Sequence, residues 1–338
     1  MKTFLKCLAF PLLFFLCVAF GGAAYFAWMP ARKTCVRCHE IRTSRDHWAV
    51  SAHREVDCKA CHGSSFSSRH ALRANAKRLW SHLREDRHPG MRLDEEQVVE
   101  MIPRCGACHQ AQFAGWRRNG HGSPYGKFLQ NDAMNAKQKP ADQCLKCHGM
   151  FADTPFMDLM THDPGTNLWR FTDARMAARP AIPCLACHAG HTDPAIATNG
   201  LYFYARADER WFAARDLMQP TVTLAGKPVR LAADSNSRLC IQCHTPLSSA
   251  VSGSGDDKTP TGAHEGLSCT ACHNPHSGSA TDSCLQCHPT FSRCKERDVR
   301  RLDTTYRSRE STHDIHHLTC TSCHPAVKPT DDKMKNDK

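Results

Sequence analysis

The stretch Cys58-Lys59-Ala60-Cys61-His62 decides how this chain folds, because its pattern, Cys-x-x-Cys-His, occurs nine times in 338 residues. A composition of 21 cysteines and 22 histidines predicts only about 0.08 occurrences by chance. The nine copies take up 18 of the 21 cysteines, so the motif is the organising unit of the sequence. The copies begin at Cys35, Cys58, Cys105, Cys144, Cys184, Cys240, Cys269, Cys284 and Cys320.

The motif has the chemistry of c-type haem attachment. Two thiols three positions apart bond to the vinyl groups of the porphyrin, and the next histidine binds the iron. We therefore predict nine covalently attached haems c. The second cysteines of the nine pairs are Cys38, Cys61, Cys108, Cys147, Cys187, Cys243, Cys272, Cys287 and Cys323. The motif histidines are His39, His62, His109, His148, His188, His244, His273, His288 and His324.

Two other uses of cysteine fit the pattern less well. Disulfides are common in exported cysteine-rich chains, but they do not need a histidine after every second cysteine. A zinc site needs further ligands at other spacings to close its tetrahedron, whereas here the histidine is always adjacent. Cys7, Cys17 and Cys294 lie outside the motifs, and we expect Cys294 to be a buried thiol.

The formal charge of +11 could indicate a nucleic-acid partner. Each haem, however, adds two propionates and, when oxidised, one positive charge at the iron–porphyrin centre. Nine haems thus contribute about −9 when oxidised and roughly −18 when reduced. The holoprotein is then near neutral or acidic. We expect no nucleic-acid partner, and we expect many arginines and lysines to pair with propionates.

The number of haems also limits the possible fold classes. With about 34 exported residues per haem, the chain is too short for a conventional apolar core. We predict a mainly α fold with much irregular loop and little β, organised around nine stacked haems. Helices are expected at 66–87 and 94–102, and a small hairpin at 221–231. The predicted segments are a transmembrane anchor or uncleaved signal at 1–30, a tetrahaem module at 31–150, a haem-poor linking module with one haem at 151–235, a tetrahaem module at 236–325 and a disordered tail at 326–338.

The N-terminal residues 7–29 carry no charge and are numerous enough to span a bilayer. Tyr25 and Trp28 suit the far interface of that bilayer. We expect an uncleaved anchor, with cleavage after Ala24 or Ala27 as the alternative. Covalent haem attachment is an exported-side event in bacteria. We therefore expect the chain in the cytoplasmic (inner) membrane, with its haem domain facing the periplasm.

Thirteen histidines lie outside the motifs, more than nine haems need as sixth ligands. Ligation by two histidines gives low-spin iron, which suits an electron carrier. A histidine beside a motif can rarely turn back to its own iron, so we expect it to reach a neighbouring haem. The expected distal ligands are His53, His121, His162, His191, His264, His276 and His316. Their rivals are His70, His82, His88, His313 and His317.

Several N-terminal stretches are similar to one known family. They are Cys35-Val-Arg-Cys38-His39-Glu-Ile, Trp48-Ala-Val-Ser-Ala-His53, Cys58-Lys-Ala-Cys61-His62, Lys77 with Trp80-Ser-His82, and Glu-Gln-Val-Val-Glu before Cys105. With the apolar N-terminus, these make the first 110 or so residues resemble the NapC/NirT-type membrane-anchored quinol dehydrogenases, particularly the anchor subunit of cytochrome c nitrite reductase.

This resemblance implies electron uptake from membrane quinol at the first haem and delivery to a periplasmic partner. Ile41 stands where the family often has a methionine ligand, so His47 or another histidine would replace it. Lys77 is the counterpart of a lysine near the quinol, or else a solvated helix residue.

The last third, with Cys272-His273-Asn-Pro-His276, resembles cytochrome c7-like and doubled-motif modules, which transfer electrons. The order His109, Trp116, His121 is similar, more loosely, to the cytochrome c554 and octahaem reductase group.

Together these features predict a membrane-anchored nonahaem cytochrome. It would carry electrons from the quinol pool through a haem chain to a periplasmic or outer-membrane partner, in anaerobic-type respiration. Membrane lipid, quinol and a periplasmic redox protein are the expected partners, and no catalytic residue is predicted outside the haem sites. The alternative is a reductase of nitrite, hydroxylamine or a sulfur oxyanion with one open haem site. The residues considered for that site are Tyr202, Tyr204, Arg206 and Asp208.

Overall fold

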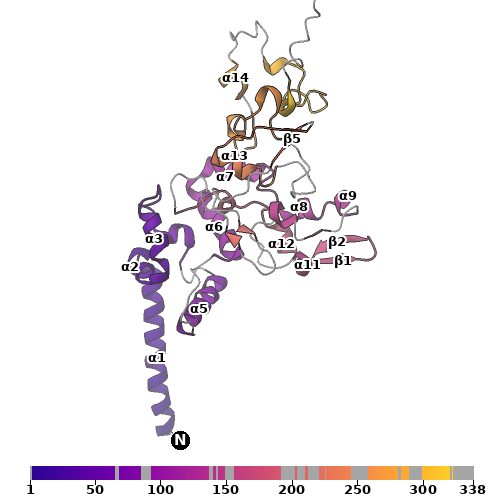
Figure 1. Ribbon diagram of the computed structural model, residues 1–338. Coiled ribbons are helices and arrows are strands. Elements are labelled where there is room, and N and C mark those ends of the chain that lie inside the picture. Colours follow the sequence, from indigo (N-terminus) through magenta and orange to yellow (C-terminus); the bar gives the residue numbers. More distant parts are fainter. Residues whose placement is uncertain are drawn as a thin grey trace, which may run out of the picture. The chain divides into compact units, whose positions relative to one another are not determined.

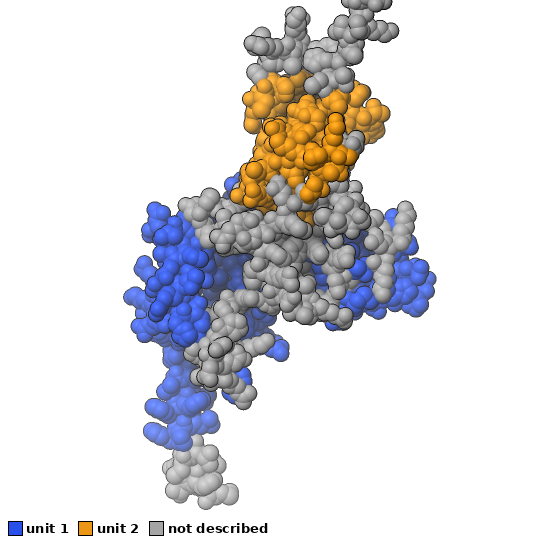
Figure 2. All heavy atoms as spheres, viewed as in Figure 1, with its two compact units in different colours: residues 1–213 blue, residues 214–338 orange. Residues whose placement is uncertain are grey.

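The computed structural model describes residues 2–64, 68–84, 93–136, 140–141, 144–148, 156–191, 202–203, 210–211, 221–224, 226–244, 258–280, 283–288, 299–319 and 322. The chain forms two compact units, Met1–Ala213 and Ala214–Lys338, which are unit 1 and unit 2 below (Figure 2). Helices dominate the described residues, and the strands pair only as short hairpins. The predicted mainly α class with little β is therefore confirmed. The finer division into five segments stays a prediction, and its tail at 326–338 lies outside the described residues.

Unit 1 begins with the long helix α1 (Lys2–Trp28), which projects from the rest of the unit (Figure 1). Its stretch Phe10–Trp28 is long and apolar enough to cross a membrane, and none of it is buried. This confirms the predicted apolar N-terminal helix. An N-terminal signal sequence has the same length and composition, so retention of the helix as an anchor stays a prediction.

The other helices of unit 1 are short, apart from α5, α6 and α7. Their bounds are α2 (Ala31–Thr34), α3 (Arg42–Ala49), α4 (Cys58–His62), α5 (Arg69–Arg84), α6 (Glu95–Cys108), α7 (Gln110–Arg118), α8 (Tyr125–Leu129), α9 (Asp132–Asn135), α10 (Leu145–His148), α11 (Phe156–Leu159) and α12 (Ala174–Ala178). The 3₁₀ turns are η1 (Cys35–Arg37), η2 (His39–Ile41) and η4 (Cys184–Ala186).

Helices α5 and α6 lie where the sequence predicts them. Helix α6 starts with a capping box, in which Asp94 Oδ1 accepts the Gln97 N–H at 2.9 Å and Gln97 Oε1 accepts the Asp94 N–H at 3.2 Å. The helix does not end at Ile102 as expected but continues to Cys108, so the third Cys-x-x-Cys is its last turn.

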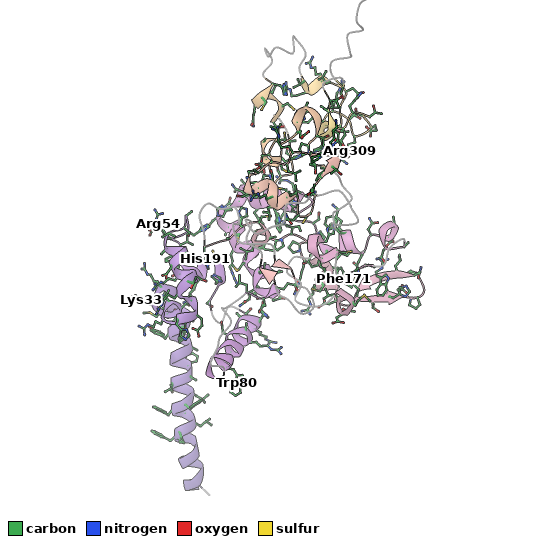
Figure 3. The ribbon with its side chains drawn as sticks, in the orientation of Figure 1. Lys33, Arg54, Trp80, Phe171, His191 and Arg309 are labelled. Atoms are coloured by element: carbon green, nitrogen blue, oxygen red, sulfur yellow. The ribbon has the colours of Figure 1, made fainter. Side chains whose placement is uncertain are left out.

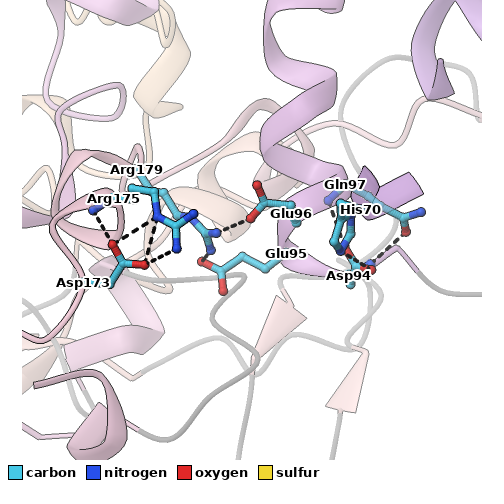
Figure 4. A network of polar contacts seen from close by, with 8 residues as sticks. All are labelled: His70, Asp94, Glu95, Glu96, Gln97, Asp173, Arg175 and Arg179. Carbon is cyan, nitrogen blue, oxygen red and sulfur yellow. Dashed lines mark hydrogen bonds and ion pairs between the residues drawn. The ribbon is translucent and has the colours of Figure 1, made fainter. Parts of the chain in front are cut away.

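A network of charged residues fixes the start of α6 (Figure 4). Arg179, which follows α12, contacts Glu95 at 2.7 Å and also pairs with Glu96. On the α5 side, His70 Nε2 lies 3.4 Å from Asp94 Oδ2. These contacts join α6 to segments before and after it in the chain, and so position the third motif at its far end.

An apolar cluster is formed by residues that follow the third motif. Tyr125 of α8 is almost fully buried and stacks on Phe171 of β2, with ring centres 6.4 Å apart. The Asn135 side-chain amide donates to the carbonyls of Leu129 and Trp169, at 3.2 and 2.8 Å. The sequence predicts no conventional core, yet this long stretch with few motifs supplies a small one. Its buried members are Tyr125, Leu129, Leu145, Leu159, Met160, Phe171, Met176 and Ala181.

Within the described residues, the strands form three antiparallel hairpins. They are β1 (Met160–Asp163) with β2 (Leu168–Phe171), β3 (Tyr202–Phe203) with β4 (Arg210–Trp211), and β5 (Thr223–Leu224) with β6 (Lys227–Pro228). The β5–β6 hairpin is the predicted one, and Gly226 in its turn has a positive φ of 76°. The β1–β2 hairpin is not predicted, although Pro164-Gly165 between its strands is a turn signal.

Unit 2 consists of short elements. They are, beside β5 and β6, α13 (Ser235–Cys240), η6 (Gly262–His264), η7 (Cys269–Ala271), α14 (Ser283–Cys287), η8 (Val299–Arg301) and η9 (Ile315–His317). Segments η6 and η9 lie side by side, because the Thr261 N–H donates to the His316 carbonyl at 2.8 Å and the Ala263 N–H to the Leu318 carbonyl at 2.7 Å. Gly262 is required there, since a Cβ would lie 2.2 Å from the Leu318 carbonyl oxygen.

Candidate haem sites

Most of the described motifs form a helical turn, but the first is extended at Cys38, with φ −79° and ψ 131°. In five of them, the N–H of the motif histidine donates to the carbonyl of the first cysteine, at 2.7 to 2.9 Å. This helical turn brings the two thiols and the imidazole of a motif together at one end of a short helix. The five are the motifs that end in His109, His188, His244, His273 and His288. The ninth motif, with Cys320, Cys323 and His324, lies outside the described residues except for Ser322.

The other uses of cysteine can be compared with the described thiols. None of them forms a disulfide. Among the described residues there is also no group of three or more His, Cys, Asp or Glu side chains placed to hold a metal ion, as a zinc site would need.

Four motif histidines each face a histidine predicted as a distal ligand. In unit 1, the ring of His109 lies 6.0 Å from that of His53, and the ring of His62 lies 5.8 Å from that of His191 (centre to centre; Figure 3 labels His191). In unit 2, the same distance is 6.5 Å between His288 and His264 and 6.0 Å between His273 and His316.

These spacings fit the haem that the motifs imply. A bond between a metal and an imidazole nitrogen is about 2 Å long, so two imidazoles on opposite sides of one iron hold their ring centres roughly 6 Å apart. Each pair joins one histidine of a motif with one from elsewhere in the chain, and ligation by these pairs stays a prediction. The ring planes differ between pairs, from 2° for His273 and His316 to 89° for His53 and His109.

Three of the facing histidines have their second ring nitrogen occupied. His53 Nδ1 lies 3.2 Å from the Gly190 carbonyl, His264 Nδ1 lies 3.2 Å from the Ile315 carbonyl, and His316 Nδ1 lies 2.9 Å from Asp314 Oδ1. A histidine that binds metal usually donates its other N–H to such an oxygen. The arrangement leaves Nε2 as the nitrogen for iron in all three.

Burial lowers the pKa of two of these imidazoles. It lowers the pKa of His191, an effect to which His47 and His53 add, and it also lowers the pKa of His316. Only the neutral imidazole offers a lone pair to a metal, so the environment favours the form that binds iron.

Other predicted ligands lie in different surroundings. His162, on β1, has its Nε2 3.1 Å from Asn167 Oδ1 and its ring against Trp169, at 5.1 Å. The backbone N–H groups of His121 and His276 bond to Asn119 and Asn274, each two residues earlier, and the roles of their rings stay predictions.

The rival histidines are also placed. His70 contacts the carboxylate of Asp94, His313 Nδ1 lies 3.9 Å from Asp303, and the His317 ring nitrogen lies 3.1 Å from Thr261 Oγ1. The side chain of His82 and all of His88 lie outside the described residues.

The motif histidines of the first and fourth motifs contact side chains other than histidine. His39 Nε2 lies 3.4 Å from Glu40, and the His39 side chain is mostly exposed. The ring of His148 stacks on Phe128 at 4.8 Å, beside the apolar cluster of unit 1.

Thiol contacts show which motifs are neighbours in unit 1. Burial is the main cause of the raised pKa of Cys61, and the thiols of Cys105 and Cys108, in the third motif, raise this pKa further. A hydrogen bond between the thiols of Cys105 and Cys184 lowers the pKa of Cys105 to about 7. The second, third and fifth motifs therefore lie together.

Unit 2 has the same kind of contacts. A hydrogen bond from the Cys240 thiol lowers the pKa of Cys269 to about 6. The pKa of Cys272 is raised by burial and then by the thiols of Cys284 and Cys287. The sixth, seventh and eighth motifs therefore follow one another in space.

Comparison with known families agrees with this geometry. Residues 104–189 match the family model of cytochrome c554 and c-prime, and residues 228–289 match that of cytochrome c7 and related cytochrome c. No curated protein and no solved structure matches the chain. Each family match contains three of the motifs.

These findings define the class: the chain carries the domains of a multihaem c-type cytochrome. More particularly, it has a cytochrome c554-type part in unit 1 and a cytochrome c7-like part in unit 2, as two of the sequence resemblances predict. Its c-type domains and apolar N-terminal helix imply an extracytoplasmic location.

Proposed function

We propose that this chain is a membrane-anchored nonahaem cytochrome that carries electrons from the quinol pool to a periplasmic or outer-membrane partner. The four facing histidine pairs carry this proposal. An iron with a histidine on each side has no position left for a substrate, which suits a carrier better than a reductase.

The pairs assign ligands to four of the sites. His62 and His191 would hold the haem of the second motif, and His109 and His53 that of the third. In unit 2, His273 and His316 would hold the haem of the seventh motif, and His288 and His264 that of the eighth. Haem supplies reversible one-electron chemistry, and these side chains fix its position and exclude exchangeable ligands.

The neighbouring motifs indicate the order of the relay within each unit. In unit 1, Cys61 lies near Cys105, and the side chains of Cys105 and Cys184 are within hydrogen-bond distance of each other. The fifth motif therefore adjoins the third. The fourth motif instead lies beside the apolar cluster, through Leu145 and Cys144. In the proposed relay the second, third and fifth sites form the main line, and the fourth is a branch.

Contacts at the end of α1 support a retained anchor. Lys59, inside the second motif, donates from Nζ to the carbonyls of Phe26 at 2.8 Å and Ala27 at 3.0 Å, and also to that of Met29. A cation on the last carbonyls of a helix satisfies them and interacts favourably with the helix dipole. The second motif is therefore fastened to the end of the apolar helix. If that helix is retained as an anchor, the haem of the second motif would lie next to the membrane surface.

Helix α5 supports contact with the lipid surface. Its sequence contains five arginines and lysines and no acidic residue, which suits anionic headgroups. Trp80 is 58% exposed and Leu72 is 50% exposed. Figure 1 shows α5 toward the end of unit 1 from which α1 projects. A quinol that leaves the bilayer here would meet the helix that carries Lys77.

Electron paramagnetic resonance of the oxidised, detergent-solubilised protein tests the ligation. We expect low-spin ferric signals from the paired sites, and we expect His191→Ala and His53→Ala each to convert one low-spin centre to high-spin. His313→Ala is the matched control, because His313 lies near Asp303 and should leave the spectrum unchanged. Unchanged spectra in the first two variants would refute the assigned pairs. A high-spin signal in the unaltered protein that nitrite perturbs would favour the reductase.

A second experiment tests the membrane and quinol parts. Membranes that contain the protein are washed with alkaline carbonate, and a reduced menaquinone analogue is then added to proteoliposomes. We expect the protein to stay with the membrane and its haem absorption to change to the reduced form. Release by the wash would reject the anchor, and retention without reduction would reject the quinol donor alone.

A further inference from the structure

The two histidine pairs of unit 2 differ in what their distal member contacts. His264 Nδ1 faces a neutral acceptor, the Ile315 carbonyl, at 3.2 Å. His316 Nδ1 faces a charged acceptor, Asp314 Oδ1, at 2.9 Å. Both histidines lie on 3₁₀ turns that are hydrogen-bonded to each other, so the contrast occurs within one small region.

We propose that Asp314 is a positioning residue that lowers the reduction potential of the haem held by His273 and His316, relative to the haem held by His264 and His288. The inference rests on the ligation proposed above. A carboxylate attracts the Nδ1 proton of its partner more strongly than a carbonyl does, because the hydrogen bond is charge-assisted. The imidazole then donates more electron density from Nε2, and this stabilises ferric iron.

Asp314 is held in place for this role. Its Oδ1 also accepts the backbone N–H of His316 at 3.0 Å, and the Thr305 hydroxyl lies 3.4 Å away. The side chain is 29% exposed. With several donors directed at it, the carboxylate cannot easily turn away from the His316 ring.

Lys258 opposes the effect from the other side of the carboxylate. Its Nζ donates to Asp314 Oδ2 at 3.1 Å, and its own side chain is 42% exposed. Part of the negative charge on Asp314 is therefore neutralised, and the carboxylate attracts the Nδ1 proton of His316 less strongly. Removal of this lysine should strengthen the effect of Asp314, whereas removal of the Asp314 charge should abolish it.

The difference matters because the two sites are neighbours. Cys272, of the seventh motif, lies within electrostatic range of Cys284 and Cys287, of the eighth. A lower potential at the seventh site makes electron passage from the seventh site to the eighth favourable, and passage in the reverse direction unfavourable. Asp314 would thus give the relay in unit 2 a direction.

The test is a redox titration of the full-length holoprotein, followed by absorbance and by electron paramagnetic resonance. In Asp314→Asn we expect one midpoint potential to rise by about 59 mV, which corresponds to a tenfold change in the equilibrium constant of a one-electron reduction. The other midpoint potentials should stay unchanged. In Lys258→Met we expect the same midpoint to fall. Asp303→Asn is the matched control, because the Asp303 carboxylate lies 3.9 Å from Nδ1 of His313, and His313 is not one of the paired histidines.

Two further results separate this inference from the proposed ligation. If His316→Ala converts a low-spin centre to high-spin but neither Asp314→Asn nor Lys258→Met moves a midpoint, the role of Asp314 is refuted and the ligation stands. If His316→Ala leaves every centre low-spin, the ligation itself is wrong and the inference fails with it. Should Asp314→Asn fail to mature, Lys258→Met decides: a fall in one midpoint supports the proposal, and no change overturns it.

Discussion

Unit 1 and unit 2 repeat the same motif but hold it differently. In unit 1, His62 faces His191 from a distant part of the sequence, and the long helix α6 and an apolar cluster support the motifs. In unit 2, the described helices and 3₁₀ turns have six residues or fewer, and the two strands have two residues each. Protein packing therefore shares the work of positioning the motifs in unit 1, whereas unit 2 must depend more on the bound haems.

Removal of one haem from each unit should test this difference between the units most clearly. We expect Cys269→Ala with Cys272→Ala to make unit 2 more than tenfold more sensitive to limited proteolysis, because the short elements lose their common support. The matched pair, Cys144→Ala with Cys147→Ala, should leave unit 1 largely protected by its apolar cluster. Mass spectrometry of the fragments locates the cuts, and equal sensitivity of the two units would contradict the difference.

The apolar cluster itself can be weakened. Phe171→Ala should lower the free energy of unfolding of unit 1 by about 3 to 5 kcal/mol, since a buried ring stacked on Tyr125 is lost. Leu267→Ala in unit 2, where the side chain is 40% exposed, should cost less than about 1 kcal/mol. Urea unfolding followed by far-ultraviolet circular dichroism measures both. A similar loss for the two variants would show that unit 1 has no special core.

The ion pairs at the start of α6 give a smaller effect. In Arg179→Met, Glu95 keeps its charge at a site where it is only 8% exposed, and the cost should be about 3 kcal/mol. Arg175→Met removes an exposed ion pair with Asp173 and should leave the urea midpoint almost unchanged, because solvent screens that pair. The same urea experiment distinguishes them, and a neutral Arg179→Met would mean that α6 is fixed by other contacts.

The contact between Lys59 and α1 should give the smallest change. Lys59→Met leaves the last carbonyls of α1 without their cation, at a cost of about 1 kcal/mol. We expect trypsin to cut at Arg32 and Lys33 several times faster, because the joint between α1 and α2 opens more often. Lys127→Met, far from the joint in sequence, is the control. An unchanged cutting rate would argue that the anchor is not fastened through Lys59.

The sequence predicts the local features of this chain well and the distant pairings poorly. The start of the helix at Asp94 and the hairpin near Gly226 depend on residues close together in sequence, and both are found where expected. The candidate distal histidines could also be named, because they stand near motifs. Their partners could not be predicted, since nothing near His191 indicates that its ring faces His62.

Other features were missed for related reasons. The role suggested for Asp314 depends on its being two residues before His316, a local pattern that could have been noticed. The apolar cluster could not, because Leu145 is part of a motif segment and Phe171 belongs to an unpredicted hairpin. Its members meet only through tertiary structure. The contact of Lys59 with α1 is likewise invisible until the two segments are placed in space.

The proposed pairing of His62 with His191 also has a consequence in time. The chain is exported from its N-terminus, so the second motif reaches the exported side long before residue 191 does. The third motif is different, because its partner His53 has already been exported when His109 emerges. The third site can therefore close during export, while the second must wait with one side of its iron uncovered until the fifth motif has passed. Assembly of this protein would then finish first at a site farther along the chain and only later at one nearer the N-terminus.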